Sequence, residues 1–165
     1  KIYVCYFCFK AKLYWQGIIH DLSKYSYTEL SESIKYYSDE RSPIEEAKDK
    51  TGMSQAWLHH KGRNPHHYEY WTDNYDNGTT TIKMPFKYAV ELICDYLAAA
   101  KVYNNGILDY RAEYEWWSKK KWNIIMHPNT KNFVTRVLYI MKTENSCDIL
   151  SDTESLKYIY SYDEI

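Results

Sequence analysis

The stretch MPFKYAVELICDYLAAAKVYN, residues 84–104, predicts one long helix and indicates a helical fold class. Pro85 suits the first turn of a helix, because the amide hydrogen that proline lacks has no partner there anyway. The helix is expected to reach about Asn104, and apolar residues dominate its segment ELICDYLAAAKVY. An acid inside such a helix, here Asp95, is usually paired or bound to a metal ion. The three alanines at 98–100 would let a ligand or another backbone come close.

Helical patterns continue on both sides of this segment. Residues 2–19 are apolar almost all round, which is typical of a buried central helix. Ser26 followed by Glu29 is a capping-box pattern, and it opens a second helix that reaches about Ser38. Further helices are predicted at residues 53–60, 109–126 and 130–142.

Two segments interrupt the helical pattern. Residues 39–52 are charged and contain Pro43 and Gly52, so we predict a loop with at most one short turn there. Residues 72–82 carry DNGTTT, which signals a hairpin turn. The chain is therefore predicted to be all-α, a helical bundle with a small β-hairpin insert near residues 72–82.

Length and charge bound the organisation of the chain. Its 165 residues predict one domain, which we place at 1–143, followed by an acidic C-terminal segment at 144–165. That segment is expected to be solvated or loosely docked. The net charge of −1 argues against nucleic acid as a partner, because a phosphate backbone selects a basic surplus. The mild basic surplus of residues 1–143 favours anionic ligands instead.

Hydropathy and cysteine content indicate the cellular setting. No apolar run approaches the ~18 residues that cross a bilayer, so no membrane association is expected. Cys5 and Cys8 are spaced as half of a zinc site, but no second pair of this kind follows. We interpret them as small apolar residues on a buried helix face. Reduced thiols predict a cytoplasmic location.

Four of the six histidines lie in AWLHHKGRNPHHYEYW, residues 56–71. They form two adjacent pairs, His59-His60 and His66-His67, on either side of a GRNP turn. Helical spacing with the apolar residues before it points His60 at the core and leaves His59 to one side. The aromatic residues around both pairs could stack a nucleobase, although a place in the core is the simpler interpretation.

His20 and Asp21 end the first apolar segment. Burying an adjacent histidine and aspartate costs free energy unless a partner is present. Consecutive side chains diverge by about 100° on a helix, so both can reach one ligand only where the helix ends or bends. We therefore expect the helix to end or bend here if the two residues act together.

Each of these residues has an ordinary explanation on its own. A buried histidine is commonly a hydrogen-bonded core residue, and Asp95 could pair with a lysine or an arginine. Together, His20, Asp21, the two histidine pairs and Asp95 form a set of nitrogen and oxygen ligands on separate helices. Imidazole and carboxylate suit zinc, iron, manganese, cobalt or nickel. The sequence thus predicts a site for one or two divalent transition metal ions.

HDLSK at 20–24 resembles the His-Asp dyad of the HD-domain metal-dependent phosphohydrolase superfamily. The later histidines and the distant Asp95 follow the order of its two-metal members. The segments HDLSKYS, AWLHHKGRNPHHYEYW, MPFKYAVELICDYLAAAK and MHPNT also resemble a family of uncharacterised bacterial and phage proteins. The resemblance covers nearly the whole chain and implies an HD-domain-like helical bundle.

The resemblance also implies roles for individual residues. The implied metal ligands are His20, Asp21, His60, His67 and Asp95. Asp21 would bridge two ions, and Lys24 would act with it in catalysis by facing the phosphate. The implied substrate contacts are Arg63, His59 and His66, with the alternative that the two histidines support the ligands from outside. The superfamily has a further histidine before the dyad, and none occurs between Lys1 and Ile19. Either it lies upstream of Lys1, or the site has one ligand fewer.

The function that the resemblance implies is a metal-dependent phosphohydrolase acting on a nucleotide or another small-molecule phosphate ester. A bound divalent ion would activate the attacking water, while Lys24 or Arg63 would stabilise charge on the phosphoryl oxygens. Two alternatives stay open at this point. One is an HD-type di-iron oxygenase, and the other is a non-enzymatic, phage-related interaction protein.

Overall fold

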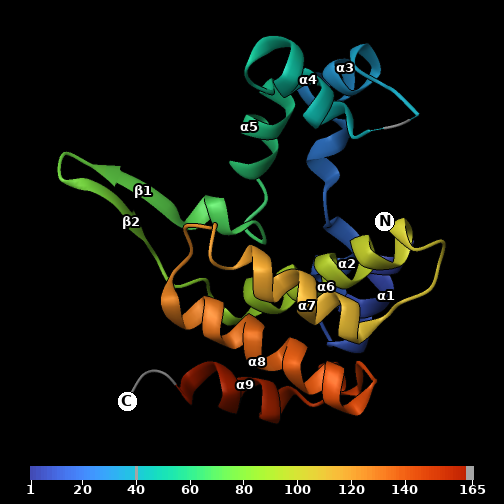
Figure 1. The fold of residues 1–165 in the computed structure, drawn as a ribbon, viewed down its shortest axis with the longest axis vertical. Coiled ribbons are helices and arrows are strands. Elements are labelled where there is room, and N and C mark those ends of the chain that lie inside the picture. Colours follow the sequence, from blue (N-terminus) through green and yellow to red (C-terminus); the bar gives the residue numbers. More distant parts are fainter. Residues whose placement is uncertain (40, 163–165) are drawn as a thin grey trace.

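The computed structural model describes residues 1–39 and 41–162, and its secondary structure there is helical apart from one hairpin (Figure 1). The α-helices are α1 (Ile2–Lys10), α2 (Tyr14–Ile19), α3 (Tyr27–Lys35), α4 (Pro43–Thr51), α5 (Gln55–Lys61), α6 (Phe86–Tyr103), α7 (Tyr110–Lys120), α8 (Pro128–Glu144) and α9 (Thr153–Ser161). Short 3-10 helices are η1 (Leu22–Tyr25), η2 (Tyr68–Trp71) and η3 (Asp148–Ser151), and the strands are β1 (Thr72–Tyr75) and β2 (Gly78–Thr81). The prediction of an all-α fold with a small β-hairpin is confirmed.

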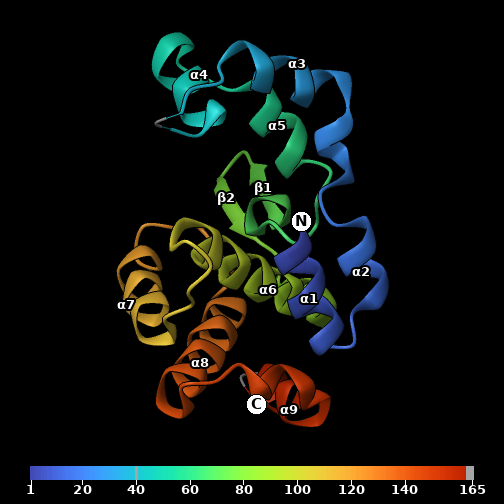
Figure 2. The same ribbon diagram turned by 90° about the vertical axis from the view of Figure 1, so that its right-hand side faces the viewer.

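Helix α6 lies at the centre of the molecule, with α1 and α7 on either side of it (Figure 2). It packs against α1 and α8, and its side chains Leu92, Ile93 and Leu97 are buried in the main core. The predicted bounds of this helix agree with the structure to within two residues at either end. Within the described part of the chain, no helix combines the length and the hydropathy that spanning a bilayer requires.

Residues 2–19 form two helices, and the prediction of one buried central helix is wrong. The chain breaks after α1, where Lys12 adopts a left-handed conformation with φ of 59°, and α2 folds back along α1. Gly17 allows this close approach, because a Cβ atom there would lie 3.0 Å from Cβ of Cys8. Much of the apolar surface of α2, including Trp15, is exposed. The central helix is α6, which has more buried residues than α1 and α2.

Helices α3, α4 and α5 form a group apart from the helices around α6 (Figure 1). The prediction of a loop over 39–52 is wrong for the described residues, because Pro43–Thr51 forms α4. Pro43 begins this helix, Gly52 ends it with φ of 80°, and Ala47 is fully buried. Proline and glycine therefore mark the two ends of a helix here, as they commonly do. Helix α7 is also shorter than predicted, since it ends at Lys120 rather than at 126.

The predicted hairpin is present and antiparallel. Thr72 pairs with Thr81 and Tyr75 pairs with Gly78, so a two-residue turn joins the strands. Gly78 has φ of 121°, a conformation that only glycine adopts readily. The hairpin links the segment carrying the second histidine pair to α6 and projects from the helical body (Figure 1).

The acidic segment packs against the core, so the prediction of a solvated or loosely docked tail is wrong for residues 144–162. Helices η3 and α9 lie against α8, and they bury Leu150 and Leu156 completely. The acids face solvent, and Asp152 caps α9 by accepting a hydrogen bond from the amide of Ser155. Acidic composition reflected only the outer face of this segment. Residues 163–165 lie outside the described part.

Replacement of Leu156 by Ala is expected to lower the free energy of unfolding by about 2–5 kcal/mol, because it leaves a cavity under α9. Urea unfolding followed by circular dichroism measures this loss. Tyr158→Ala, at an exposed position of the same helix, is the matched control and should cost under about 1 kcal/mol. Equal small losses in both variants would contradict a docked tail.

Helix α7 buries a carboxyl group that should make stability depend on pH. Burial raises the pKa of Glu113 from 4.5 to about 7, against the opposing charge of Lys120. Between these two values the unfolded chain loses the proton and the folded chain keeps it, so the free energy of unfolding falls as pH rises. Glu113→Gln should therefore gain roughly 1–3 kcal/mol relative to the native protein between pH 4.5 and pH 8.

Urea unfolding of both proteins at the two pH values measures this difference. Glu115→Gln, an exposed change on the same helix, is the control. A Glu113→Gln difference that is the same at both pH values would contradict a raised pKa.

Candidate metal centre

The end of α2 brings two consecutive side chains to one place. After Ile19 the backbone leaves the helix, with His20 in an extended conformation and Asp21 in the left-handed region at φ of 55°. Aspartate tolerates this region better than most residues, because its short side chain can bond locally. As a result, Nε2 of His20 and Oδ2 of Asp21 lie 3.4 Å apart. The helix ends where the sequence required it to end if both were to act together.

The two histidine pairs meet because the chain reverses after α5. His60 lies in the last turn of α5, and the side-chain amide of Asn64 donates a 2.8 Å hydrogen bond to its carbonyl oxygen. The reversal places the rings of His66 and His67 4.2 Å apart, with His67 4.8 Å from His60. Trp57 packs edge-on against His67 with ring centroids 5.1 Å apart. Its contacts therefore support the simpler interpretation, in which this aromatic packs behind the imidazoles.

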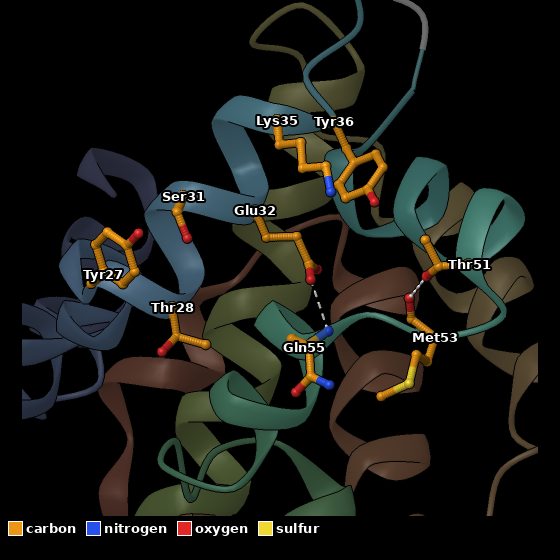
Figure 3. A pocket seen from close by; sticks show the side chains of 9 residues that line it. All are labelled: Tyr27, Thr28, Ser31, Glu32, Lys35, Tyr36, Thr51, Met53 and Gln55. Carbon is orange, nitrogen blue, oxygen red and sulfur yellow. Dashed lines mark hydrogen bonds between the residues drawn. The ribbon is translucent and has the colours of Figure 1, made fainter.

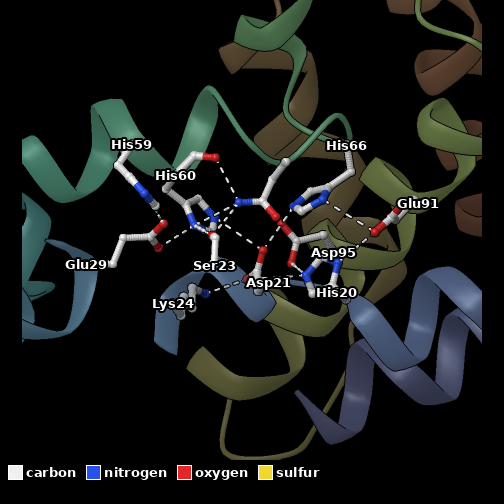
Figure 4. Close-up of polar contacts among 11 residues, drawn as sticks. His20, Asp21, Ser23, Lys24, Glu29, His59, His60, His66, Glu91 and Asp95 are labelled. Carbon is white, nitrogen blue, oxygen red and sulfur yellow. Dashed lines mark hydrogen bonds and ion pairs between the residues drawn. The ribbon is translucent and has the colours of Figure 1, made fainter. Parts of the chain in front are cut away.

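Side chains from four segments converge on Asp21 (Figure 4). Oδ1 of Asp21 lies 3.2 Å from Nε2 of His60 and 3.4 Å from Nε2 of His66. Nε2 of His20 lies 3.3 Å from Oδ1 of Asp95 on α6. Two groups have their potential ligand atoms within 4.8 Å of one another, namely Asp21, His60, His66 and His67, and His20, His66 and Asp95.

The donor atoms fit a metal ion better than they fit one another. Four of them are buried without a hydrogen-bond partner: Nε2 of His20, Oδ1 of Asp21, Nε2 of His66 and Nε2 of His67. Leaving a buried polar atom unpaired costs about 1–3 kcal/mol, so four in one cluster call for a shared partner. Tetrahedral zinc with ligands at about 2.0–2.2 Å places those ligands roughly 3.3–3.6 Å from one another. The nitrogen–oxygen separations of 3.2–3.4 Å are close to that spacing.

Two buried glutamates orient the imidazoles from outside. Oε1 of Glu91 lies 3.0 Å from Nδ1 of His20 and 3.4 Å from Nδ1 of His66. Glu29 contacts Nδ1 of His60 at 2.8 Å with one oxygen and Nδ1 of His59 at 2.6 Å with the other. A carboxylate that binds Nδ1 leaves Nε2 for the metal, which is the usual arrangement around ligating histidines.

Residues 1–140 match a protein-family model described as "Family of unknown function (DUF5662)". The chain belongs to the DUF5662 family. No curated protein and no solved structure matches this chain. The DUF5662 match runs from α1 into α8, so it includes all residues of the candidate metal centre and leaves out η3 and α9.

The histidines of the candidate metal centre differ in their protonation states. Burial lowers the pKa of His66 to about 2 and that of His67 to about 4, so both carry a free electron pair at neutral pH. Burial also opposes protonation of His20, but contacts with Asp21, Asp95 and Glu91 outweigh it and raise the pKa to about 11. A cation entering the centre would displace that proton, as metal binding to histidine generally does.

The predicted metal ligands all lie in this cluster, and His66 lies there as well. His66 is buried and belongs to both groups of donor atoms, whereas its implied role was a substrate contact. The predicted contact His59 pairs with Glu29, outside the converging atoms. Arg63 is exposed. Lys24 lies at the edge of the centre, with Nζ 2.6 Å from Oδ2 of Asp21.

Sequence reasoning missed Glu29 and Glu91. Glu91 stands one helical turn before Asp95, so the spacing of two acids on an apolar helix was a usable signal. Glu29 was assigned to the capping box, and its amide does bond Oγ of Ser26 at 3.4 Å. Its carboxylate, however, turns to the histidines, and nothing in the local sequence indicates that.

A cavity of about 260 Å³ opens over the metal centre, lined in part by Asp21, Lys24, Tyr25 and Asp95. Another cavity, of about 560 Å³, lies between α3, α4 and α5 (Figure 3). Its carboxylate, Glu32, already accepts hydrogen bonds from the amides of Gln55 and Ala56 at the start of α5. The smaller cavity therefore opens the candidate metal centre to solvent, whereas the larger one is lined by none of its residues.

Proposed function

We propose that this chain is a metal-dependent phosphohydrolase that acts on a nucleotide or another small phosphate ester. The observation that carries the proposal is the cluster of buried, unpartnered imidazole and carboxylate atoms beneath a cavity lined by Lys24. The resemblance of HDLSK to the HD dyad supports the same reaction class. The donor set suits zinc, iron, manganese, cobalt or nickel.

Two ions would share the centre through Asp21. One would be held by Oδ1 of Asp21 with His60, His66 and His67, and a second by Oδ2 with His20 and Asp95. A single imidazole nitrogen binds one ion, whereas a carboxylate has two oxygens. Asp21 is therefore the residue able to bridge, and its lowered pKa, to which His20, His60 and Lys24 contribute against burial, keeps both oxygens ionised.

Such an ion, when bound, would act as a Lewis acid and lower the pKa of its water from about 15.7 towards about 7. The chain itself would supply position and charge. Lys24 is largely exposed and reaches into the cavity, so its ammonium can contact a phosphoryl oxygen while it stays near Asp21. A cation at this position would stabilise the charge that develops on phosphoryl oxygens.

Metal analysis combined with a substrate screen tests the proposal. The purified chain is analysed for bound metals, reconstituted without oxygen with each of the five metals, and supplied with nucleoside monophosphates and sugar phosphates. Phosphate release that requires a metal is expected. Oxygen consumption by the iron form without phosphate release would favour the oxygenase instead. A folded chain that binds no metal and releases no phosphate would refute an enzyme of either kind.

A further inference from the structure

A cavity of about 440 Å³ lies between α6 and α7, next to the metal centre. It shares the lining residues Asp95, Ala99 and Tyr103 with the cavity over the centre, so the two cavities lie next to each other along α6. The volume is within the range of about 300–1,000 Å³ that small-molecule sites occupy.

Two aromatic rings and one ammonium group form a wall of this cavity. The rings of Tyr96 and Trp116 stand edge-to-face, with centroids 5.2 Å apart. Nζ of Lys120 lies 4.5 Å from the centroid of Trp116 and 5.3 Å from that of Tyr96. Trp116 is about two-fifths exposed, so part of its surface is open to a ligand. Such a wall suits a flat aromatic group, which stacks on rings at about 1–3 kcal/mol per base.

One polar group that lines the same cavity has no hydrogen-bond partner in the described part of the chain. Glu113 is buried on α7, and its carboxyl enters no ion pair or hydrogen bond in the described part of the chain. Burial raises the pKa of Glu113 to about 7, so near neutral pH this carboxyl can donate as well as accept. Buried polar groups are nearly always satisfied, which points to a ligand with hydrogen-bonding edges.

We propose that the cavity between α6 and α7 binds the nucleobase of a nucleotide whose phosphate lies at the metal centre. This inference rests on the proposed phosphohydrolase function and narrows its substrate to nucleotides. Stacking on Trp116 would use the flat face of the base. Glu113 would bond a ring nitrogen or an exocyclic group of the base, which a plain hydrocarbon ring could not offer.

Calorimetric titration of the full chain with adenosine, guanosine, cytidine and uridine tests the inference without relying on hydrolysis. At least one nucleoside should bind. Trp116→Ala and Glu113→Gln should each weaken that binding by about tenfold or more. Glu115→Gln, on the same helix but bonded to Arg111 at the surface, is the matched control and should change affinity less than about twofold.

Three results would overturn the inference: no nucleoside binding at millimolar concentration, unchanged affinity in Trp116→Ala, or equal binding of phenol. The last would reveal a site for any aromatic ring. These outcomes are separable from a failure of the proposed function, because nucleosides carry no phosphate. Metal-dependent release of phosphate from sugar phosphates without nucleoside binding would refute only the proposed nucleobase site. Nucleoside binding without metal binding or hydrolysis would refute only the proposed phosphohydrolase function.

Discussion

Replacement of Asp21 by Asn is expected to abolish metal binding and to reduce metal-dependent phosphate release at least ~100-fold. Loss of a residue that only orients a metal ligand costs up to ~100-fold, and Asp21 would be a ligand itself. Both carboxylate oxygens are engaged, one towards His60 and His66 and the other towards His20. Asparagine keeps the shape but removes the charge and presents an amide hydrogen to the imidazoles. The left-handed backbone at residue 21 should persist, since asparagine also tolerates it.

Metal content per chain, measured after dialysis, and phosphate release are the two readouts. Asp49→Asn is the matched control, because Asp49 forms an exposed ion pair with Arg41 far from the centre. It should leave both readouts unchanged, as expected for a surface pair. If the Asp21→Asn protein keeps the native metal content, the centre does not depend on this carboxylate and the proposal is wrong.

Glu91→Gln is expected to weaken metal affinity by about 10-fold to 100-fold, although Glu91 would touch no metal. Its carboxylate holds Nδ1 of both His20 and His66, and so fixes the two rings with Nε2 facing inward. Both imidazoles contact the same oxygen, Oε1, and the neutral amide of glutamine would offer an oxygen there without the negative charge that strengthens these contacts. The imidazoles would then lose orientation and basicity.

Competition with a chromophoric chelator, using zinc and cobalt, measures this affinity. A merely structural role would lower the thermal stability of the metal-free chain without changing affinity in the folded state. Glu29→Gln is the informative comparison, because Glu29 holds His60 and His59 on the opposite side of the centre. Loss of stability with unchanged metal affinity in Glu91→Gln would show that Glu91 only fills the core.

Local signals predicted those parts of the fold that local physics controls. Ser26 accepts the hydrogen bond that begins α3, and Gly78 supplies the positive φ of the hairpin. The same type of signal was misread over 39–52, where Pro43 and Gly52 bound a helix instead of marking a loop. The high charge density suggested a loop there. The segment is nevertheless a helix, and Ala47 is the buried residue on its inner face. The composition of a segment averages over all faces of a helix, whereas packing depends only on the face that meets the rest of the protein.

Prediction of the candidate site was limited in a similar way. The sequence indicated His20, Asp21, His60, His67 and Asp95 as a group, and the structure brings these residues together. Sequence spacing did not distinguish His66 from His67, because the direction of each ring depends on how the chain reverses after α5. Glu29 and Glu91 escaped notice because their partners are at least 30 residues away along the chain.

By itself the sequence determined the helical class, the position of the hairpin, the long apolar helix over residues 86–103 and the chemical type of the candidate ligand set. These follow from periodicity, capping and residue chemistry, which act over a few neighbouring residues. Only the tertiary structure decided that residues 2–19 fold back on themselves, that the acidic tail docks, and that two glutamates hold the imidazoles. Such outcomes depend on which distant surfaces meet, since burial and electrostatic pairing are set by neighbours in space and not in sequence.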